Sequence, residues 1–255
     1  MKFKIQNLLI SFLSIVSLSY SGGAQGKEIG KIYSQLSYSP VATANYINSK
    51  GDAVEEEFFT RHKVENYGEV GIWNTTTALI WNTSLVQQDI AGKSSTGLGP
   101  STFGIQHQYL NSAIKLGAGI ATELPSPSNP DSHLSHSEVI NSISHFLTYS
   151  SHQANIHFMM DGIDKAIAYD YSYTWQPASA LYIKGVIRGQ KNLSTLDSNS
   201  SNLGLNLQTE YISPGVEAFY SLNSNWHLLG AFYGGAAMKN IYAFPGLKVG
   251  IAWTN

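Results

Sequence analysis

Apolar and polar side chains alternate along most of the chain after residue 26, in stretches of about ten residues. Between residues 167 and 176 the odd positions are Ile, Tyr, Tyr, Tyr and Trp, whereas the even positions are Ala, Asp, Ser, Thr and Gln. A period of two places successive side chains on opposite faces of a strand. Strands with one apolar and one polar face are typical of membrane barrels, in which one face contacts lipid and the other the lumen.

The same pattern predicts twelve strands joined by alternately long and short connections. The expected strands cover residues 29–39, 63–73, 77–88, 101–110, 112–123, 138–151, 154–161, 166–176, 180–191, 205–222, 226–238 and 243–254. Tight turns are expected at 74–76, 111–112, 152–153, 177–179 and 223–225. Longer connections are expected at 40–62, 89–100, 124–137, 162–165, 192–204 and 239–242.

This alternation also predicts the orientation of the barrel. Bacterial outer-membrane barrels have short periplasmic turns and longer extracellular loops, and an even strand number returns the C-terminus to the periplasm. We therefore expect an all-β fold, an antiparallel up-and-down transmembrane β-barrel of about 12 strands, with 40–62 outside the cell. A soluble β-sandwich is the alternative fold, and the outward rows of Tyr, Ile and Trp argue against it.

One strand changes phase. In 205–222 the apolar positions are odd before Ser213 and even after Gly215, and Pro214 lies between them. A proline lacks the backbone donor of a sheet and is tolerated at a bulge. A bulge is therefore expected at 213–215.

The first residues have the composition of an export signal. Lys2 and Lys4 precede an uncharged, serine-interrupted stretch up to Tyr20, and small residues follow as far as Ala24. This order is typical of a secretory signal peptide, whereas a membrane-spanning helix needs about 20 apolar residues. We expect a signal peptide at 1–24 rather than a membrane anchor, followed by one barrel domain at 25–255 in the cell outer membrane.

The composition narrows the class further. The chain contains no cysteine, which excludes a lipidated N-terminal cysteine, disulfides and thiol catalysis. Charged residues make up 13% of the chain, against roughly 25% in soluble domains. The net charge is −2 without a basic patch, so nucleic-acid binding is not expected. The mean hydropathy of −0.11 suits a barrel, because only alternate residues face lipid.

Three segments carry a resemblance to a known family. They are Tyr-Ser-Gln-Leu-Ser-Tyr-Ser-Pro at 33–40 with Asn-Ser-Lys-Gly-Asp at 48–52, Tyr-Gly-Glu-Val-Gly at 67–71 leading to Gly-Leu-Gly at 97–99 and the strand ending in Tyr109, and Ile-Ser-Pro-Gly-Val at 212–216. The chain resembles the outer-membrane family named for the meta-pathway of phenol degradation, over most of the segment after the signal. The resemblance implies a monomeric, transporter-like barrel and, by the family name, a hydrophobic or aromatic solute. This chain has Pro100 where the family typically has an acidic residue, so no role of that carboxylate is carried over.

Charged side chains on the polar faces form the first candidate site. Eight of them are expected to line the lumen: Glu69, Lys115, Asp170, Lys184, Arg188, Glu210, Glu217 and Lys248. A charge toward a wet lumen costs little, whereas a charge toward lipid costs several kcal/mol. These residues form either a permeation path that selects solutes or a salt-bridged network that fills the barrel.

Metal and catalytic sites are weaker candidates. His133 and His136 share a polar loop with Asp131 and Glu138, and such a loop is a poor scaffold for convergent metal ligands. The nearest Ser and His neighbours lie at 133–135 and 150–152, and the His-x-Ser-Asn-Gly segment of a twelve-stranded outer-membrane phospholipase is absent. We expect no metal, no cofactor and no catalytic residue, and a lipid hydrolase is only a remote alternative.

Aromatic side chains near strand ends complete the picture. Tyr33, Tyr38, Tyr67, Trp73, Trp81, Tyr109, Trp175, Trp226 and Trp253 are assigned to the membrane girdle rather than to a sugar site. The expected function is a passive pore for a small solute, and the alternative is a surface structural or adhesive protein acting through 40–62. The expected partners are outer-membrane lipid, the small-molecule solute and the barrel-assembly machinery, and we expect a monomer.

Overall fold

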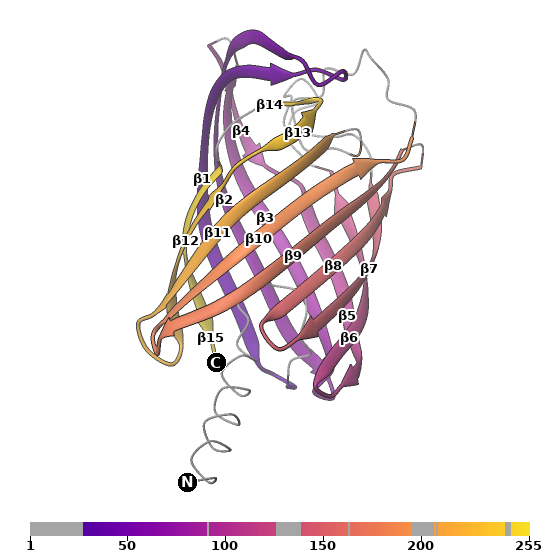
Figure 1. Cartoon of the computed structure of the whole chain (residues 1–255), viewed down its shortest axis with the longest axis vertical. Coiled ribbons are helices and arrows are strands. Elements are labelled where there is room, and N and C mark those ends of the chain that lie inside the picture. Colours follow the sequence, from indigo (N-terminus) through magenta and orange to yellow (C-terminus); the bar gives the residue numbers. More distant parts are fainter. Residues whose placement is uncertain are drawn as a thin grey trace.

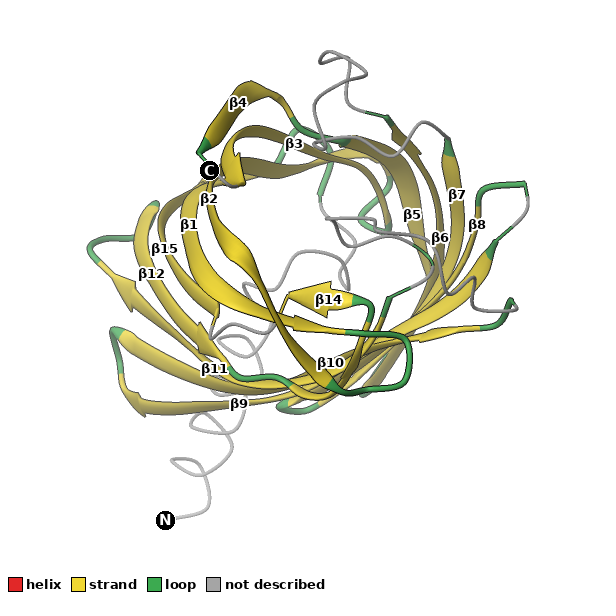
Figure 2. Cartoon of the chain, turned by 90° about the horizontal axis from the view of Figure 1, so that it is seen from above, coloured by secondary structure: helices red, strands yellow, loops and turns green. Residues whose placement is uncertain are grey.

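The chain forms a closed antiparallel β-barrel, seen from the side in Figure 1 and from above in Figure 2. The computed structural model describes residues 28–90, 92–125, 139–162, 164–194, 207, 209–242 and 246–255. The expected signal peptide at 1–24 and the histidine loop around His133 and His136 lie outside these ranges. Within these ranges, no helix could serve as a membrane span.

Twelve strands make up the barrel wall, and three short strands extend it at one end. The strands are β1 (Ile32–Ile47), β2 (Ala53–Trp73), β3 (Thr77–Ile90), β4 (Lys93–Leu98), β5 (Ser101–Asn111), β6 (Ile114–Leu124), β7 (Ile140–Tyr149), β8 (His152–Met160), β9 (Lys165–Ala178), β10 (Leu181–Asn192), β11 (Glu210–Ser221), β12 (Trp226–Tyr233), β13 (Ala236–Lys239), β14 (Ile241–Tyr242) and β15 (Gly246–Thr254). Each wall strand pairs with its sequence neighbour, while β15 pairs with both β1 and β12. The predicted fold class and strand number are confirmed.

The first and last wall strands, β1 and β15, pair with each other, and the start of β1 and the end of β15 lie at the end of the barrel that carries the tight turns (Figure 1). Tyr33 of β1 pairs with Thr254 of β15, and the backbone N–H of Ile32 donates to Asn255 Oδ1 at 2.7 Å. The pairing of β1 with β15 closes the sheet, so every wall strand has a hydrogen-bonded neighbour on both sides for at least part of its length.

Side chains alternate between lumen and outer surface as predicted. On β9, Tyr171, Tyr173 and Trp175 are 43, 47 and 55% exposed, whereas Ser172 between them is fully buried at 0%. The lumen face carries small and polar residues, and the outer face carries large apolar ones. The alternation read from 167–176 is therefore the orientation found in the barrel.

The segment 40–62 was expected to be a loop, and this expectation is wrong. β1 continues to Ile47 and β2 begins at Ala53, so both strands rise well above the rest of the wall (Figure 1). Pro40 lies opposite His62 inside this hairpin. Between Tyr38 and Tyr46, β1 has no described pairing on its β15 side, and a proline is tolerated at such an edge.

Three further expectations on boundaries need correction. Residues 93–98, expected in a loop, form β4 and pair with the upper half of β3. His152 and Gln153, expected in a turn, belong to β8, and the turn lies at Ser150, whose φ is +53°. The bulge expected at 213–215 is absent from the pairing of β10 with β11, which runs without a shift from Gln190 opposite Tyr211 to Leu181 opposite Tyr220. Tyr211 faces the lumen, as Glu217 and Phe219 do. The odd positions of β11 therefore face the lumen along the whole described strand, and no extra residue is needed to restore the register.

Candidate functional site

The lumen contains a polar cavity of about 270 Å³ between opposite parts of the wall. Its lining includes three acidic and three basic residues, together with amides, tyrosines, one histidine, Phe219 and Leu229. The charged residues are Glu65, Asp170, Lys184, Arg188, Glu217 and Lys248. The formal charge of the lining is therefore balanced.

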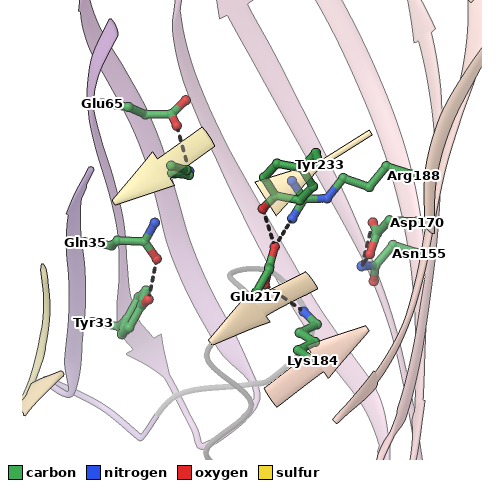
Figure 3. A network of polar contacts seen from close by, with 10 residues as sticks. Tyr33, Gln35, Glu65, Asn155, Asp170, Lys184, Arg188, Glu217 and Tyr233 are labelled. Atoms are coloured by element: carbon green, nitrogen blue, oxygen red, sulfur yellow. Dashed lines mark hydrogen bonds and ion pairs between the residues drawn. The ribbon is translucent and has the colours of Figure 1, made fainter. Parts of the chain in front are cut away.

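Glu217 is the centre of an ion cluster on β10, β11 and β12 (Figure 3). Its carboxylate accepts a hydrogen bond from Arg188 Nη2 at 2.5 Å and one from the hydroxyl of Tyr233 at 2.6 Å. The ammonium nitrogen of Lys184 lies 3.9 Å from the other oxygen of the Glu217 carboxylate. Lys184 is directly opposite Glu217 in the β10–β11 register, so strand pairing alone brings these two charges together.

Tyr233 fixes the position of Arg188 from a third strand. The guanidinium carbon of Arg188 lies 4.7 Å from the centroid of the Tyr233 ring, a cation–π distance. The ring lies against Gly215, where a Cβ atom would be 2.3 Å from Tyr233 Cδ1. Glycine at 215 therefore leaves the space that the tyrosine ring occupies.

A second ion cluster is centred on Glu65 of β2. Its carboxylate contacts Lys63 Nζ at 2.7 Å, Lys248 Nζ at 3.0 Å and Asn82 Nδ2 at 3.0 Å. Lys248 belongs to β15 and reaches past β1 to make this contact. Glu65 thus has two cationic partners and one neutral donor.

Asp170 on β9 has a different environment. Both of its oxygens accept hydrogen bonds from Asn155 Nδ2, at 2.8 and 2.9 Å, and His157 Nε2 lies 4.0 Å away. Asp170 is opposite Arg188 in the β9–β10 register, but the guanidinium of Arg188 turns to Glu217 instead (Figure 3). Within the described ranges, no lysine or arginine nitrogen lies within 4.0 Å of the Asp170 carboxylate.

The structure places five of the eight predicted charges at the cavity: Asp170, Lys184, Arg188, Glu217 and Lys248. Glu69 lies on the lumen face outside the cavity and accepts a hydrogen bond from the Tyr67 hydroxyl at 2.5 Å. Lys115 lies on the lumen face near the turn between β5 and β6, also outside the cavity.

Glu210 is the exception, because the expected lumen orientation is wrong for this residue. Its carboxylate pairs with Lys191 Nζ at 2.7 Å and Lys239 Nζ at 3.3 Å. Lys191 follows the lumen-facing Gln190 on β10 and therefore points to the outer face. Glu210 opens β11, and its side chain joins these lysines outside the barrel rather than Arg188 inside it.

Several cavity residues are not among those predicted from the sequence, including Glu65, Asn155, His157 and Tyr233. Glu65 had a usable signal, because it shares the odd phase of Glu69 within the same predicted strand. Tyr33 and Tyr67 were assigned to the membrane girdle, and this is wrong. Tyr33 is 3% exposed and donates to Gln35 Oε1 at 2.8 Å, and both tyrosines have the lumen-facing phase of their strands.

The described residues offer little for metal binding or hydrolysis. They contain no group of three or more His, Asp or Glu side chains that could hold a metal ion. Ser221 Oγ and His227 Nδ1 lie 3.0 Å apart, but both face the lumen, whereas a lipid hydrolase would need this pair on the outer face. His152 Nδ1 contacts the Tyr171 hydroxyl at 2.6 Å, and the pair expected at 133–135 lies outside the described residues.

Comparisons with known proteins identify the fold. No protein-family model matches the sequence, and no curated protein matches it either. The structure is similar to the COG4313 outer membrane channel from Pseudomonas putida F1, with a TM-score of 0.71 and 12% identity over 92% of this chain and 98% of that chain. It is also similar to the translocator domain of the autotransporter NalP from Neisseria meningitidis, with a TM-score of 0.53 and 8% identity over 98% of this chain and 97% of that chain. At these identities the likeness shows the fold alone, and that fold is an outer-membrane β-barrel.

Proposed function

We propose that the chain is a passive outer-membrane pore for small solutes. The observation that carries the proposal is a closed barrel whose lumen holds a cavity of about 270 Å³ with charged walls. Charged groups that line a lumen are the usual means by which a pore selects solutes. The similar barrel from Pseudomonas putida F1 is itself described as a channel, which supports the same function here.

The outer surface supports a location in the membrane. Large apolar side chains are exposed on many wall strands, including Ile187 at 47%, Val216 at 53% and Phe232 at 57%. Monomeric soluble proteins rarely expose continuous apolar surfaces of this kind. Trp73 and Trp175, at 70 and 55% exposed, lie near the end of the barrel that carries the tight turns, where an aromatic girdle is expected.

The cavity also indicates a narrow path that favours polar solutes. Long charged side chains extend from both sides of the lumen, and the three acids and three bases of the lining cancel in charge. We expect low conductance and a weak preference between cations and anions. The hydrophobic or aromatic solute implied by the family resemblance is less compatible with this lining than a polar one is.

The pore is tested by measuring single-channel currents of the purified chain in a planar lipid bilayer. We expect small, stable conductance steps in the wild type. Arg188→Ala should increase the conductance and shift the reversal potential toward cation preference, because it removes one cation and shortens a side chain. Lys50→Gln, in the exposed tip of the β1–β2 hairpin, is the control with the same loss of charge. Absence of conductance in both the wild type and Arg188→Ala would contradict the proposal.

A second candidate is a surface contact made by the β1–β2 hairpin. This hairpin rises above the rest of the wall and exposes Val54 and Phe58 at 40 and 60% (Figure 1). Joining Ala42 to Thr60, which are opposite in the register, by a short turn would remove the hairpin above that level. A pore should keep its conductance after this change, whereas an adhesive protein should lose binding to cells or matrix.

A further inference from the structure

We propose that the cavity contains a subsite for a small zwitterion whose opposite charges lie a few ångström apart, as in a free α-amino acid. Arg188 would bind the carboxylate and Asp170 the ammonium group. The inference rests on the proposed pore function and names the class of solute that this pore favours.

Asp170 has hydrogen-bonding capacity left for a solute. Its neighbours are the neutral amide of Asn155 and the imidazole of His157. A carboxylate has about four lone-pair positions, and Asn155 uses one on each oxygen. The Asp170 side chain is 24% exposed to the lumen, so a cationic group can reach the positions that remain.

Arg188 is held in a fixed position at the wall of the cavity. Glu217 holds one end of the guanidinium and the Tyr233 ring covers one face. The side chain is nevertheless 41% exposed, and a guanidinium has five N–H donors. The remaining donors therefore form a positioned site for a carboxylate beside the cavity.

The two charged groups lie close together. Asp170 and Arg188 are directly opposite on neighbouring strands and face the lumen. Residues opposite one another have Cβ atoms about 4.5–5.5 Å apart. A simple anion bound to Arg188 would lie close to the charge of Asp170, and a simple cation bound to Asp170 would lie close to Arg188. Only a solute with both charges is attracted by one group without being repelled by the other.

The other charges of the cavity do not compete for such a solute. Lys184 and Glu217 are a buried pair, with side chains 5 and 6% exposed. Glu65 of β2 and Lys248 of β15, at 16 and 20% exposure, are joined to each other at 3.0 Å. Arg188 and Asp170, at 41 and 24%, are therefore the most exposed of the six charged residues of the lining, and His157 lies beside Asp170 at 40% exposure.

The experiment measures how alanine, propionate and ethylammonium reduce the KCl conductance of the full mature chain in a planar bilayer. We expect alanine to reach half-block at a concentration about tenfold lower than either singly charged solute, equivalent to about 1.4 kcal/mol. Asp170→Asn should remove the preference for alanine over propionate, and Arg188→Gln should remove the preference for alanine over ethylammonium. Asp52→Asn and Lys50→Gln, both in the exposed hairpin tip, are the matched charge controls and should keep the wild-type pattern.

The outcomes separate the subsite from the pore. Equal block by all three solutes in a conducting wild-type channel would overturn the subsite and leave the pore intact. A preference for alanine that survives Asp170→Asn would also overturn it. A chain that conducts no ions would overturn both. Heat-modifiable migration of each variant on gels shows whether it has folded, and the comparison of solutes on the wild type needs no variant at all.

Discussion

Replacing Glu217 with glutamine should both destabilise the barrel and change its ion selectivity. The variant keeps the shape of the side chain and an oxygen for the Tyr233 hydroxyl, but it leaves Lys184 and Arg188 without their anion. Lys184 and Glu217 have side chains only 5 and 6% exposed, and their charged atoms are 3.9 Å apart. With an effective dielectric constant of about 20, two unit charges at that distance interact with about 4 kcal/mol.

The expected loss of stability is about 3 kcal/mol. Removing one partner of a buried ion pair costs roughly 3–5 kcal/mol, because it leaves an uncompensated charge. The Arg188 side chain is 41% exposed, so its share is screened by solvent and adds little. The lining of the cavity would then carry two acids and three bases in place of three of each, which should shift the reversal potential toward anion preference.

The free energy of unfolding is measured by reversible urea denaturation in lipid vesicles, followed by the fluorescence of the five tryptophans. Adding Lys184→Met to Glu217→Gln should recover part of the loss, since it removes the buried cation. A loss below about 1 kcal/mol, or strictly additive losses in the double variant, would refute the reasoning, because neighbours in one ion cluster should show coupling.

Three further predictions concern the wall and the orientation of the barrel. Ile187→Arg, which puts a charge on the lipid-facing side of β10, should destabilise by about 2–4 kcal/mol if it lies near the midplane, whereas Ile187→Leu should be nearly neutral in the same urea assay. Gly250→Ala should cost roughly 1–3 kcal/mol, because its Cβ would lie 2.5 Å from the Leu36 carbonyl oxygen, while Gly185→Ala meets nothing within 4 Å and should change little. An epitope inserted after Gly51 should be labelled on intact cells and one after Thr75 should not, and reversed labelling would invert the orientation.

The faces of the membrane-spanning strands could be predicted from the sequence. Asp170 and Tyr171 are adjacent, and alternation alone assigned one to the lumen and the other to lipid. The reason is local: a charge in lipid is so costly that each spanning strand has to keep its own period of two. The same argument found Lys184, Arg188 and Glu217, which line the cavity.

Strand lengths outside the membrane were not predictable in this way. Residues 53–62 contain three consecutive glutamates and two phenylalanines, yet they form the start of β2 and pair with β1. Where a hairpin rises above the lipid, neither of its faces needs to be apolar. The alternation of apolar and polar residues therefore ends there, although the backbone hydrogen bonds between the two strands continue. Glu210, at the start of β11, was expected in the lumen because the apolar residues before it occupy odd positions. In β11 itself the odd positions face the lumen, so Glu210 points outward.

The sequence by itself determined a barrel of twelve amphipathic strands, the face that meets lipid and most of the charges inside. Only the tertiary structure decided which of those charges meet. Lys248 pairs with Glu65 across 183 positions of the chain, and Arg188 turns to Glu217 although Asp170 lies directly opposite. These contacts depend on closure of the sheet, on strand register and on the ring of Tyr233 against Gly215, and no local pattern encodes a distance between strands that are remote in sequence.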